Sequence, residues 1–194
     1  VVEGYMDVIA LAQAGVDNAV APLGTALTAD QLKLLLRTVP EVVLAFDGDS
    51  AGREAAWRSL ETALPEMGRG RSVRFLFLPE GEDPDSMVRA EGAEAFRERV
   101  AAAVPLFELL IQGLKERVDL SAPEGRHRLL ELAGPLYGRI GDDKLRDFLV
   151  QRLDGIVKLG PKQVRGHLQQ SRGRQRGGES APAADRGRRP AELL

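Results

Sequence analysis

Cysteine is missing from all 194 residues of this sequence, and histidine occurs only twice. The lack of cysteine excludes a disulfide scaffold, a thiolate metal site and a cysteine nucleophile in this chain. Aromatic residues make up only 5%, and no apolar run approaches the roughly 20 residues that cross a membrane. No signal peptide is recognisable at the start. The remaining composition, 43% hydrophobic and 29% charged, is typical of a soluble protein, for which we expect a cytoplasmic location and no membrane partner.

Charge is distributed unevenly along the chain. The formal net charge is −2, but residues 161–194 carry eight basic and three acidic side chains, whereas residues 1–160 carry 19 basic and 26 acidic. The basic tail has no aromatic residue and is rich in Gly, Pro, Gln, Ser and Ala. Such a composition cannot bury enough apolar surface to order the chain, so we predict a disordered tail. It is interpreted either as a solvated linker or as a segment whose arginines hold a nucleic-acid backbone.

Strand-like and helix-like patterns alternate over residues 1–91. The nearly continuous apolar run Glu41–Phe46 predicts a strand covered on both faces, and Val73–Leu78 predicts another. Further strands are predicted at residues 1–2 and 18–23, and helices at residues 5–14, 29–38 and 51–64. Such alternation predicts an α/β fold with a mainly parallel sheet flanked by helices. In sheets of this kind the functional site lies beyond the carboxyl ends of the strands.

After residue 84 the pattern becomes helical and is broken into short pieces by proline and glycine. We predict helices that begin near Ser86, Pro105, Glu124 and Asp142. The chain is therefore divided into an α/β part (1–91), a small helical bundle (92–160) and the basic tail (161–194). Because the sequence starts at Val1, inside an apolar run and without methionine, we expect a fragment whose upstream part is missing.

Acidic residues gather where three of the predicted strands end. They form three groups: Glu3 with Asp7, Asp47 with Asp49, and Asp83 with Asp85. The carboxyl ends of parallel strands meet at one edge, and carboxylates brought together there would repel and raise one another's pKa. A hard divalent cation relieves that repulsion, and all-oxygen sites suit Mg²⁺ or Mn²⁺. The sequence therefore predicts a metal site at this edge.

Each acidic group also has a structural interpretation. Asp83, followed by Pro84, is a good helix start, and Asp49 can cap the helix after it. A calcium-binding EF-hand loop from Asp47 is excluded, because Ala51 and Arg58 stand where it needs oxygen ligands. The spacing also departs from that of haloacid dehalogenase-type phosphatases. For the two histidines, His127 and His167, which lie apart from the acids in sequence, we expect structural or solvent-exposed roles.

Four motifs together resemble the Toprim domain of bacterial DnaG-type DNA primases. They are Val2–Val8 (VEGYMDV), Pro22–Thr28 (PLGTALT), Phe46–Arg53 (FDGDSAGR) and Glu82–Asp85 (EDPD). The resemblance continues through Ser121–Arg126 (SAPEGR) and covers about residues 1–160. It assigns residues 1–91 to the Toprim catalytic domain and residues 92–160 to the helical subdomain that follows.

The resemblance implies a metal-dependent nucleotidyltransferase that makes short RNA primers on single-stranded DNA during replication. In this family Glu3 would act near the reacting phosphate, as a metal ligand or in proton transfer. Asp47 and Asp49 would bind Mg²⁺ or Mn²⁺, Asp83 and Asp85 would complete the acidic cluster, and Asp7 would support it. Arg53 is either a phosphate contact or a surface residue paired with an acid such as Glu54.

The implied partners are a single-stranded DNA template, ribonucleoside triphosphates, the RNA primer and the replicative helicase. Zinc is expected only in an N-terminal domain that this cysteine-free chain lacks. The helicase would bind a C-terminal domain that is not recognisable in this sequence. We therefore expect this chain to bind metal but to prime poorly or not at all in isolation.

Two alternatives stay open. One is another Toprim enzyme, such as a topoisomerase-like or nuclease-like protein. A topoisomerase would need a tyrosine nucleophile, and only Tyr5 and Tyr137 are present. The other is a non-catalytic module that binds metal or nucleotide without turnover.

Overall fold

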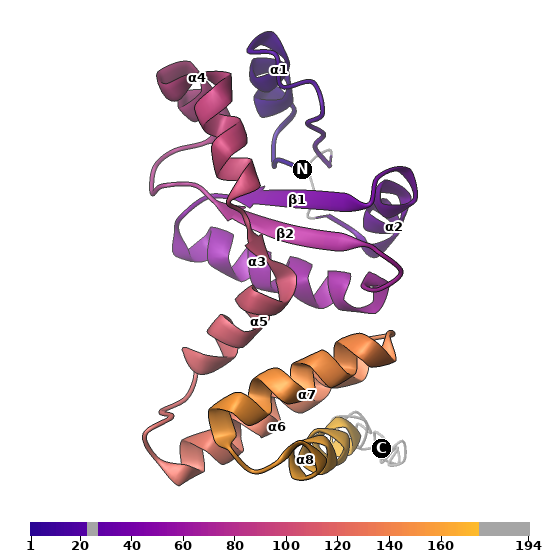
Figure 1. Cartoon of the computed structure of the whole chain (residues 1–194). Coiled ribbons are helices and arrows are strands. Elements are labelled where there is room, and N and C mark those ends of the chain that lie inside the picture. Colours follow the sequence, from indigo (N-terminus) through magenta and orange to yellow (C-terminus); the bar gives the residue numbers. More distant parts are fainter. Residues whose placement is uncertain (23–26, 175–194) are drawn as a thin grey trace, which may run out of the picture.

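The computed structural model describes residues 1–22 and 27–174 (Figure 1). Its elements are α1 (Tyr5–Gln13), α2 (Ala29–Thr38), β1 (Glu41–Phe46), α3 (Ser50–Ala63), the 3₁₀ helix η1 (Leu64–Glu66), β2 (Ser72–Phe77), α4 (Pro84–Ala101), β3 (Val104–Pro105), α5 (Leu106–Lys115), α6 (Pro123–Arg139), α7 (Asp143–Val157) and α8 (Pro161–Arg174). The order confirms the α/β class followed by helices. Part of the predicted Pro22–Thr28 motif, residues 23–26, lies outside the described residues.

The sheet is centred on two parallel strands. β1 pairs with β2 in parallel from Glu41 opposite Ser72 to Phe46 opposite Phe77. The two-residue strand β3 adds to the other side of β2 in antiparallel orientation. The strands predicted at residues 41–46 and 73–78 are thus confirmed to within a residue, whereas β3 was not predicted.

Two predicted strands, at residues 1–2 and 18–23, are not found within the described residues, and residue 23 lies outside them. Residues 1–2 and 18–22 are not strands, although Val1 lies against the edge of β1. Its amino group donates to the Val43 carbonyl (2.6 Å), and its carbonyl accepts from the Ala45 amide (2.8 Å). The Val2 amide in turn donates to the Val20 carbonyl (2.9 Å). These bonds resemble the start of a parallel ladder, but two residues are too few to extend it.

The sheet is covered by helices on both faces, as the apolar character of its strands predicts. Figure 1 shows α3 on one face and α1 with α4 on the other. Alternate residues of β1 point to opposite faces, so that Leu44 joins the core with α2, α3 and α5, while Ala45 joins the core with α1 and α4. β2 divides in the same way, with Phe75 on the first face and Leu76 on the second.

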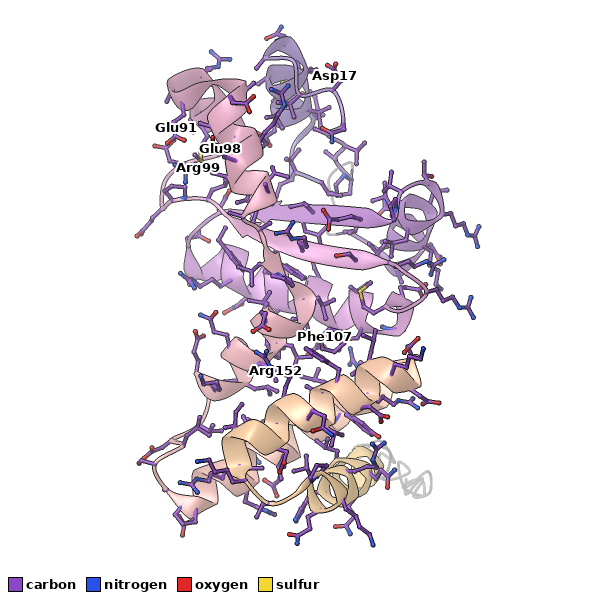
Figure 2. The ribbon with its side chains drawn as sticks, in the orientation of Figure 1. Asp17, Glu91, Glu98, Arg99, Phe107 and Arg152 are labelled. Atoms are coloured by element: carbon purple, nitrogen blue, oxygen red, sulfur yellow. The ribbon has the colours of Figure 1, made fainter. Side chains whose placement is uncertain are left out.

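Helix α4 runs through the predicted domain division at residue 91. Gly92 has a left-handed φ of 83° and interrupts the helix there. Across this break the Arg99 guanidinium donates two hydrogen bonds to the Glu91 carboxylate, at 2.9 and 2.7 Å (Figure 2). Met87 before the break and Phe96 after it belong to the same core. The division at residue 91 remains a prediction.

Helices α5 to α8 form the predicted bundle, and it is larger than predicted. At the α5–α7 crossing, Phe107 packs edge-to-face on Phe148 with ring centroids 5.7 Å apart, and Arg152 donates to Glu108 (2.6 Å; Figure 2). The prediction that the chain is disordered from residue 161 is wrong for Pro161–Arg174, which form α8. The rest of the predicted tail, residues 175–194, lies outside the described residues.

The reason for α8 is the pair Val164 and Leu168. They stand four residues apart on one face of the helix and are fully buried in the core shared with α6. Gly134 of α6 allows the close approach, because a Cβ atom there would lie 2.4 Å from the Ser171 Cβ. No helix in the described ranges has both the length and the apolar character needed to cross a membrane.

Candidate metal centre

The first acidic segment is held by the start of α1. Gly4 precedes the helix in an extended conformation, and its amide donates to Asp7 Oδ2 (3.1 Å). The Val2 side chain is buried in the core with α1 and α4 and anchors the segment from below. Glu3 stands between these two fixed points, near Asp47 at the carboxyl end of β1.

The second segment, Asp47-Gly48-Asp49, turns from β1 into α3. Asp49 caps α3, because its Oδ1 accepts from the Gly52 amide (2.7 Å). Two glycines permit the turn: a Cβ on Gly48 would lie 2.1 Å from the Leu78 carbonyl oxygen, and one on Gly52 would lie 2.1 Å from the Asp47 carbonyl oxygen. Asp47 therefore sits in a backbone arrangement that only small neighbours allow.

The third segment follows β2 and starts α4. Asp83 caps the helix, with Oδ1 accepting from the Ser86 amide (2.7 Å), and Pro84 occupies the first turn. Asp85 accepts a hydrogen bond from Arg89 one turn further on. The structural interpretation of Asp49 and Asp83 as helix caps is thus confirmed.

The three segments meet at one small cavity of about 330 Å³. Its lining includes four of the predicted acids, and the full set is Glu3, Gly4, Asp7, Ala45, Asp47, Leu78, Asp83 and Pro84. We call this the acidic cavity. Asp49 and Asp85 do not line it, since each turns toward its own helix. Residues far apart in the sequence therefore converge at the predicted edge.

The acidic side chains of the cavity influence one another's protonation. Desolvation raises the pKa of Glu3, and the nearby Asp47 carboxylate raises it further. The pKa of Asp47 is raised in the same way by desolvation and by Asp49 and Asp83. The pKa of Asp7 is also raised, first by desolvation and then by neighbouring carboxylates including Asp83, although the hydrogen bond from Gly4 opposes this. The cavity thus concentrates negative charge that a cation would stabilise.

The donor chemistry suits a hard divalent cation, because every ionisable group that lines the cavity is a carboxylate. Within residues 1–22 and 27–174, however, no three Asp, Glu or His side chains stand in an arrangement that could hold one metal ion. The metal-ligand roles of Glu3, Asp47, Asp49, Asp83 and Asp85 remain predictions.

Arg53 lies on the opposite face of this end of the sheet from the acidic cavity. Its guanidinium is 5.8 Å from the centre of the Phe77 ring. Glu54, the predicted alternative partner, forms its ion pair with Arg58 (3.7 Å). Whether Arg53 contacts phosphate remains a prediction.

Two contacts were not predicted. His127 of α6 and His167 of α8 pack edge-to-face with ring centroids 5.4 Å apart, and the Arg117 guanidinium lies 3.8 Å from the centre of the Trp57 ring. No local signal marks either contact, because each joins residues distant in sequence. The two tyrosines also differ, since Tyr5 is exposed and Tyr137 is buried.

Comparisons with known proteins agree with this fold. A family described as Toprim-like matches residues 1–88, and the DnaB-helicase binding domain of primase matches residues 107–161. The DNA primase of Escherichia coli (strain K12) is 56% identical over 160 residues, 82% of this chain and 27% of that protein. The DNA primase of Pseudomonas aeruginosa (strain PAO1) is 53% identical over 165 residues, 84% of this chain and 25% of that protein.

Solved structures show the same relationship. A crystal structure of a DNA primase domain from Pseudomonas aeruginosa has a TM-score of 0.82 at 52% identity, covering 86% of this chain and 52% of that one. A structure described as the DnaG primase catalytic domain bound to ssDNA has a TM-score of 0.80 at 53% identity, covering 84% and 51%.

The small, partly parallel sheet and the acids at its carboxyl edge define the first part of the chain as a Toprim-type domain. With the helices that follow, the chain belongs to the bacterial DnaG-type DNA primases. It spans about a quarter of the length of the curated relatives that it matches.

One expectation about partners is wrong. No helicase-binding segment was expected to be recognisable in this sequence, yet the family model of that description covers residues 107–161, from the start of α5 to the start of α8. The candidate site residues were recognised where acidic groups follow strands, whereas residues 107–161 contain helices and no strand.

Proposed function

We propose that this chain is the metal-binding part of a DNA primase, which transfers nucleotides to make RNA primers on single-stranded DNA. The observation that carries the proposal is the convergence of Glu3, Asp7, Asp47 and Asp83 on one cavity at the carboxyl edge of the sheet. The close relatives named as DNA primases supply the reaction class. The substrates would be ribonucleoside triphosphates, the growing RNA primer and a single-stranded DNA template.

In this proposal Glu3, Asp47 and Asp83 hold Mg²⁺ or Mn²⁺ in the acidic cavity, with Asp7 as support. Asp49 and Asp85 would join the metal by turning away from the Gly52 amide and from Arg89. When bound, such cations lower the pKa of a hydroxyl nucleophile and neutralise the charge on phosphate. Asp7 fixes the start of α1 through its bond with the Gly4 amide, and this positions Glu3. The raised pKa of Glu3 suits a group that accepts a proton from the primer 3′-hydroxyl. Arg53 would contact phosphate near the carboxyl edge.

Calorimetric titration with Mn²⁺ tests the metal site. The chain should bind Mn²⁺, and the double variant Asp47→Asn, Asp49→Asn should not. Asp17→Asn is the matched control. Asp17 is an exposed acid beyond α1 (Figure 2), so its substitution removes the same charge per site without touching the cavity. If both variants bind Mn²⁺ like the unchanged chain, the acids are only helix caps and solvated charges, and the proposal fails.

Priming by the chain alone should be weak, because it represents about a quarter of its relatives' length. Primer synthesis on single-stranded DNA, measured with labelled ribonucleotides, should appear only when this part is joined to the remainder of a primase. Efficient synthesis by the isolated chain would contradict this expectation. A restored protein that binds Mn²⁺ but makes no primer would instead favour the non-catalytic module.

The helical part is proposed to contact the replicative helicase. Its support is the match of residues 107–161 to the helicase-binding family.

A topoisomerase-like reaction is not favoured, since Tyr137 is buried and Tyr5 begins α1 beside the acidic cavity. Trapping of a covalent protein–DNA adduct would overturn that conclusion.

A further inference from the structure

The single tryptophan of this chain lies where the Toprim-type part meets the helical part. Trp57 of α3 packs directly on the backbone of α5, because a Cβ on Gly113 would lie 2.4 Å from the Trp57 Cζ3 atom. The indole Nε1 donates to Glu61 (3.0 Å), and the Arg117 guanidinium covers the ring at 3.8 Å. The indole is therefore fixed in place, with a cationic plane stacked on it.

Two cavities of about 470 and 430 Å³ meet at this stack. Trp57 and Arg117 line both of them. The larger also includes Arg53, Phe77 and Gln112, and the smaller extends between α6 and α8 past Arg128. We call the two together the Trp57 groove. Its lining combines charged and aromatic side chains with aliphatic ones such as Val104 and Leu109, and it is open to solvent.

Two arginines of the groove keep their hydrogen-bond donors available. Arg53 lies over the Phe77 ring and Arg117 over the Trp57 ring. Within the part of the chain that the structure describes, neither makes an ion pair, and both are exposed. Guanidinium groups stacked on aromatic rings present planar donor forks that match phosphate oxygens.

The acids that line the groove have partners of their own. Glu54 pairs with Arg58 (3.7 Å), and Glu61 accepts from Arg139 (3.1 Å). Glu116 accepts from the Gln112 amide (2.9 Å). These interactions reduce the competition of the acids for Arg53 and Arg117.

The groove begins close to the acidic cavity. Phe77 lines the groove and Leu78 lines the acidic cavity, and consecutive residues at the end of a strand point to opposite faces of the sheet. Arg53 stands one helical turn after the cap Asp49. A flexible chain that passes around this edge would reach both sites.

We propose that the Trp57 groove binds a single strand of nucleic acid, with phosphates on Arg53 and Arg117 and bases stacked beside the arginine–tryptophan pair. Single strands are bound sequence-independently by this combination of basic and aromatic side chains. The inference goes beyond the proposed function, because it needs no metal and places the strand on a surface apart from the acidic cavity.

Trp57 provides its own readout, because it is the only tryptophan in the chain. The chain is titrated with an oligothymidylate of about 12 nucleotides, within the usual range of single-strand sites. EDTA is present throughout, so failure of the metal site cannot affect the result. Trp57 emission should change and saturate, and the anisotropy of a labelled oligonucleotide should rise over the same concentrations.

The double variant Arg53→Ala, Arg117→Ala should bind about tenfold more weakly, and the slope of log affinity on log salt should fall by about 1.4, since single strands release about 0.7 counterion per neutralised phosphate. Arg37→Ala is the control, because Arg37 is an exposed arginine of α2 outside the groove. Arg117→Lys keeps the charge but loses the planar stack, so its affinity should lie between those of the unchanged chain and the double variant.

Three results would overturn the proposal. Binding by the double variant equal to that of Arg37→Ala would show that the groove does not contact the strand. A rise in anisotropy without any change in Trp57 emission would place the strand elsewhere on the chain. Unchanged DNA binding by the double variant, together with loss of binding to the replicative helicase, would identify the groove as a protein-docking surface.

Discussion

At the scale of single residues, the position of Asp47 depends on a glycine five residues later. A side chain on Gly52 would meet the Asp47 carbonyl oxygen at 2.1 Å, so Gly52→Ala must push the start of α3 away from the end of β1. We predict a loss of about 1–3 kcal/mol in the free energy of unfolding, typical of overpacking. Mn²⁺ affinity should fall as well, because Asp47 moves. Urea denaturation and calorimetry measure the two effects.

Gly155→Ala is the matched control for this prediction. Gly155 lies within α7, and an added Cβ would meet no atom within 4 Å. Alanine should there raise stability by about 0.5–1 kcal/mol, because glycine is the poorer helix former. Equal effects of the two substitutions would mean that the close contact at Gly52 relaxes without moving Asp47.

The sequence predicted where the candidate acids lie along the chain, but not the direction in which each side chain points. Strand ends were recognisable from apolar runs, and Glu3, Asp47 and Asp83 do meet at one cavity. Asp49 was grouped with Asp47 at the predicted metal site. Instead its carboxylate turns to the unpaired Gly52 amide at the start of α3. The hydrogen bond that caps α3 is local, and it holds the Asp49 carboxylate away from the acidic cavity.

At the scale of elements, local signals predicted some segments and missed others. Asp83 was a recognisable helix cap, and it accepts the expected amide hydrogen bond. Helix α8 was missed because the composition of residues 161–194 as a whole suggested disorder. The spacing of Val164 and Leu168 was the available signal, but two apolar residues specify a helix only when α6 offers a face to bury them.

We predict that Leu168→Ala detaches or loosens α8. Leu168 is fully buried, and truncating a buried leucine costs about 2–5 kcal/mol through lost burial and the cavity left behind. Gln169→Ala, at the neighbouring exposed position, should change stability by less than about 0.5 kcal/mol. Urea unfolding of both variants tests the packing, and equal stability would show that α8 contributes nothing to the bundle.

At the scale of the whole molecule, folding brings three charged segments together that are apart in the unfolded chain. The raised pKa values of Glu3, Asp7 and Asp47 mean that the folded state binds protons more tightly than the unfolded state. By linkage, these groups make stability fall as pH rises from their unfolded pKa through the raised folded one. The edge that carries the proposed function is thus a source of instability without a cation.

Asp47→Asn should show whether the negative charge at this edge lowers the stability of the fold. Without metal, the variant should be more stable than the unchanged chain at pH 7.5, by about 0.5 kcal/mol because the group is largely solvated and screened. The difference should shrink near pH 3, below the ordinary Asp pKa of 3.8, where Asp47 is mostly protonated in both states. With Mn²⁺ at ten times its dissociation constant, the unchanged chain should gain about 1.4 kcal/mol and become the more stable of the two. Thermal unfolding at both pH values, with Mn²⁺ or EDTA, measures the crossover. A variant that is less stable under every condition would show that Asp47 supports the fold rather than a cation.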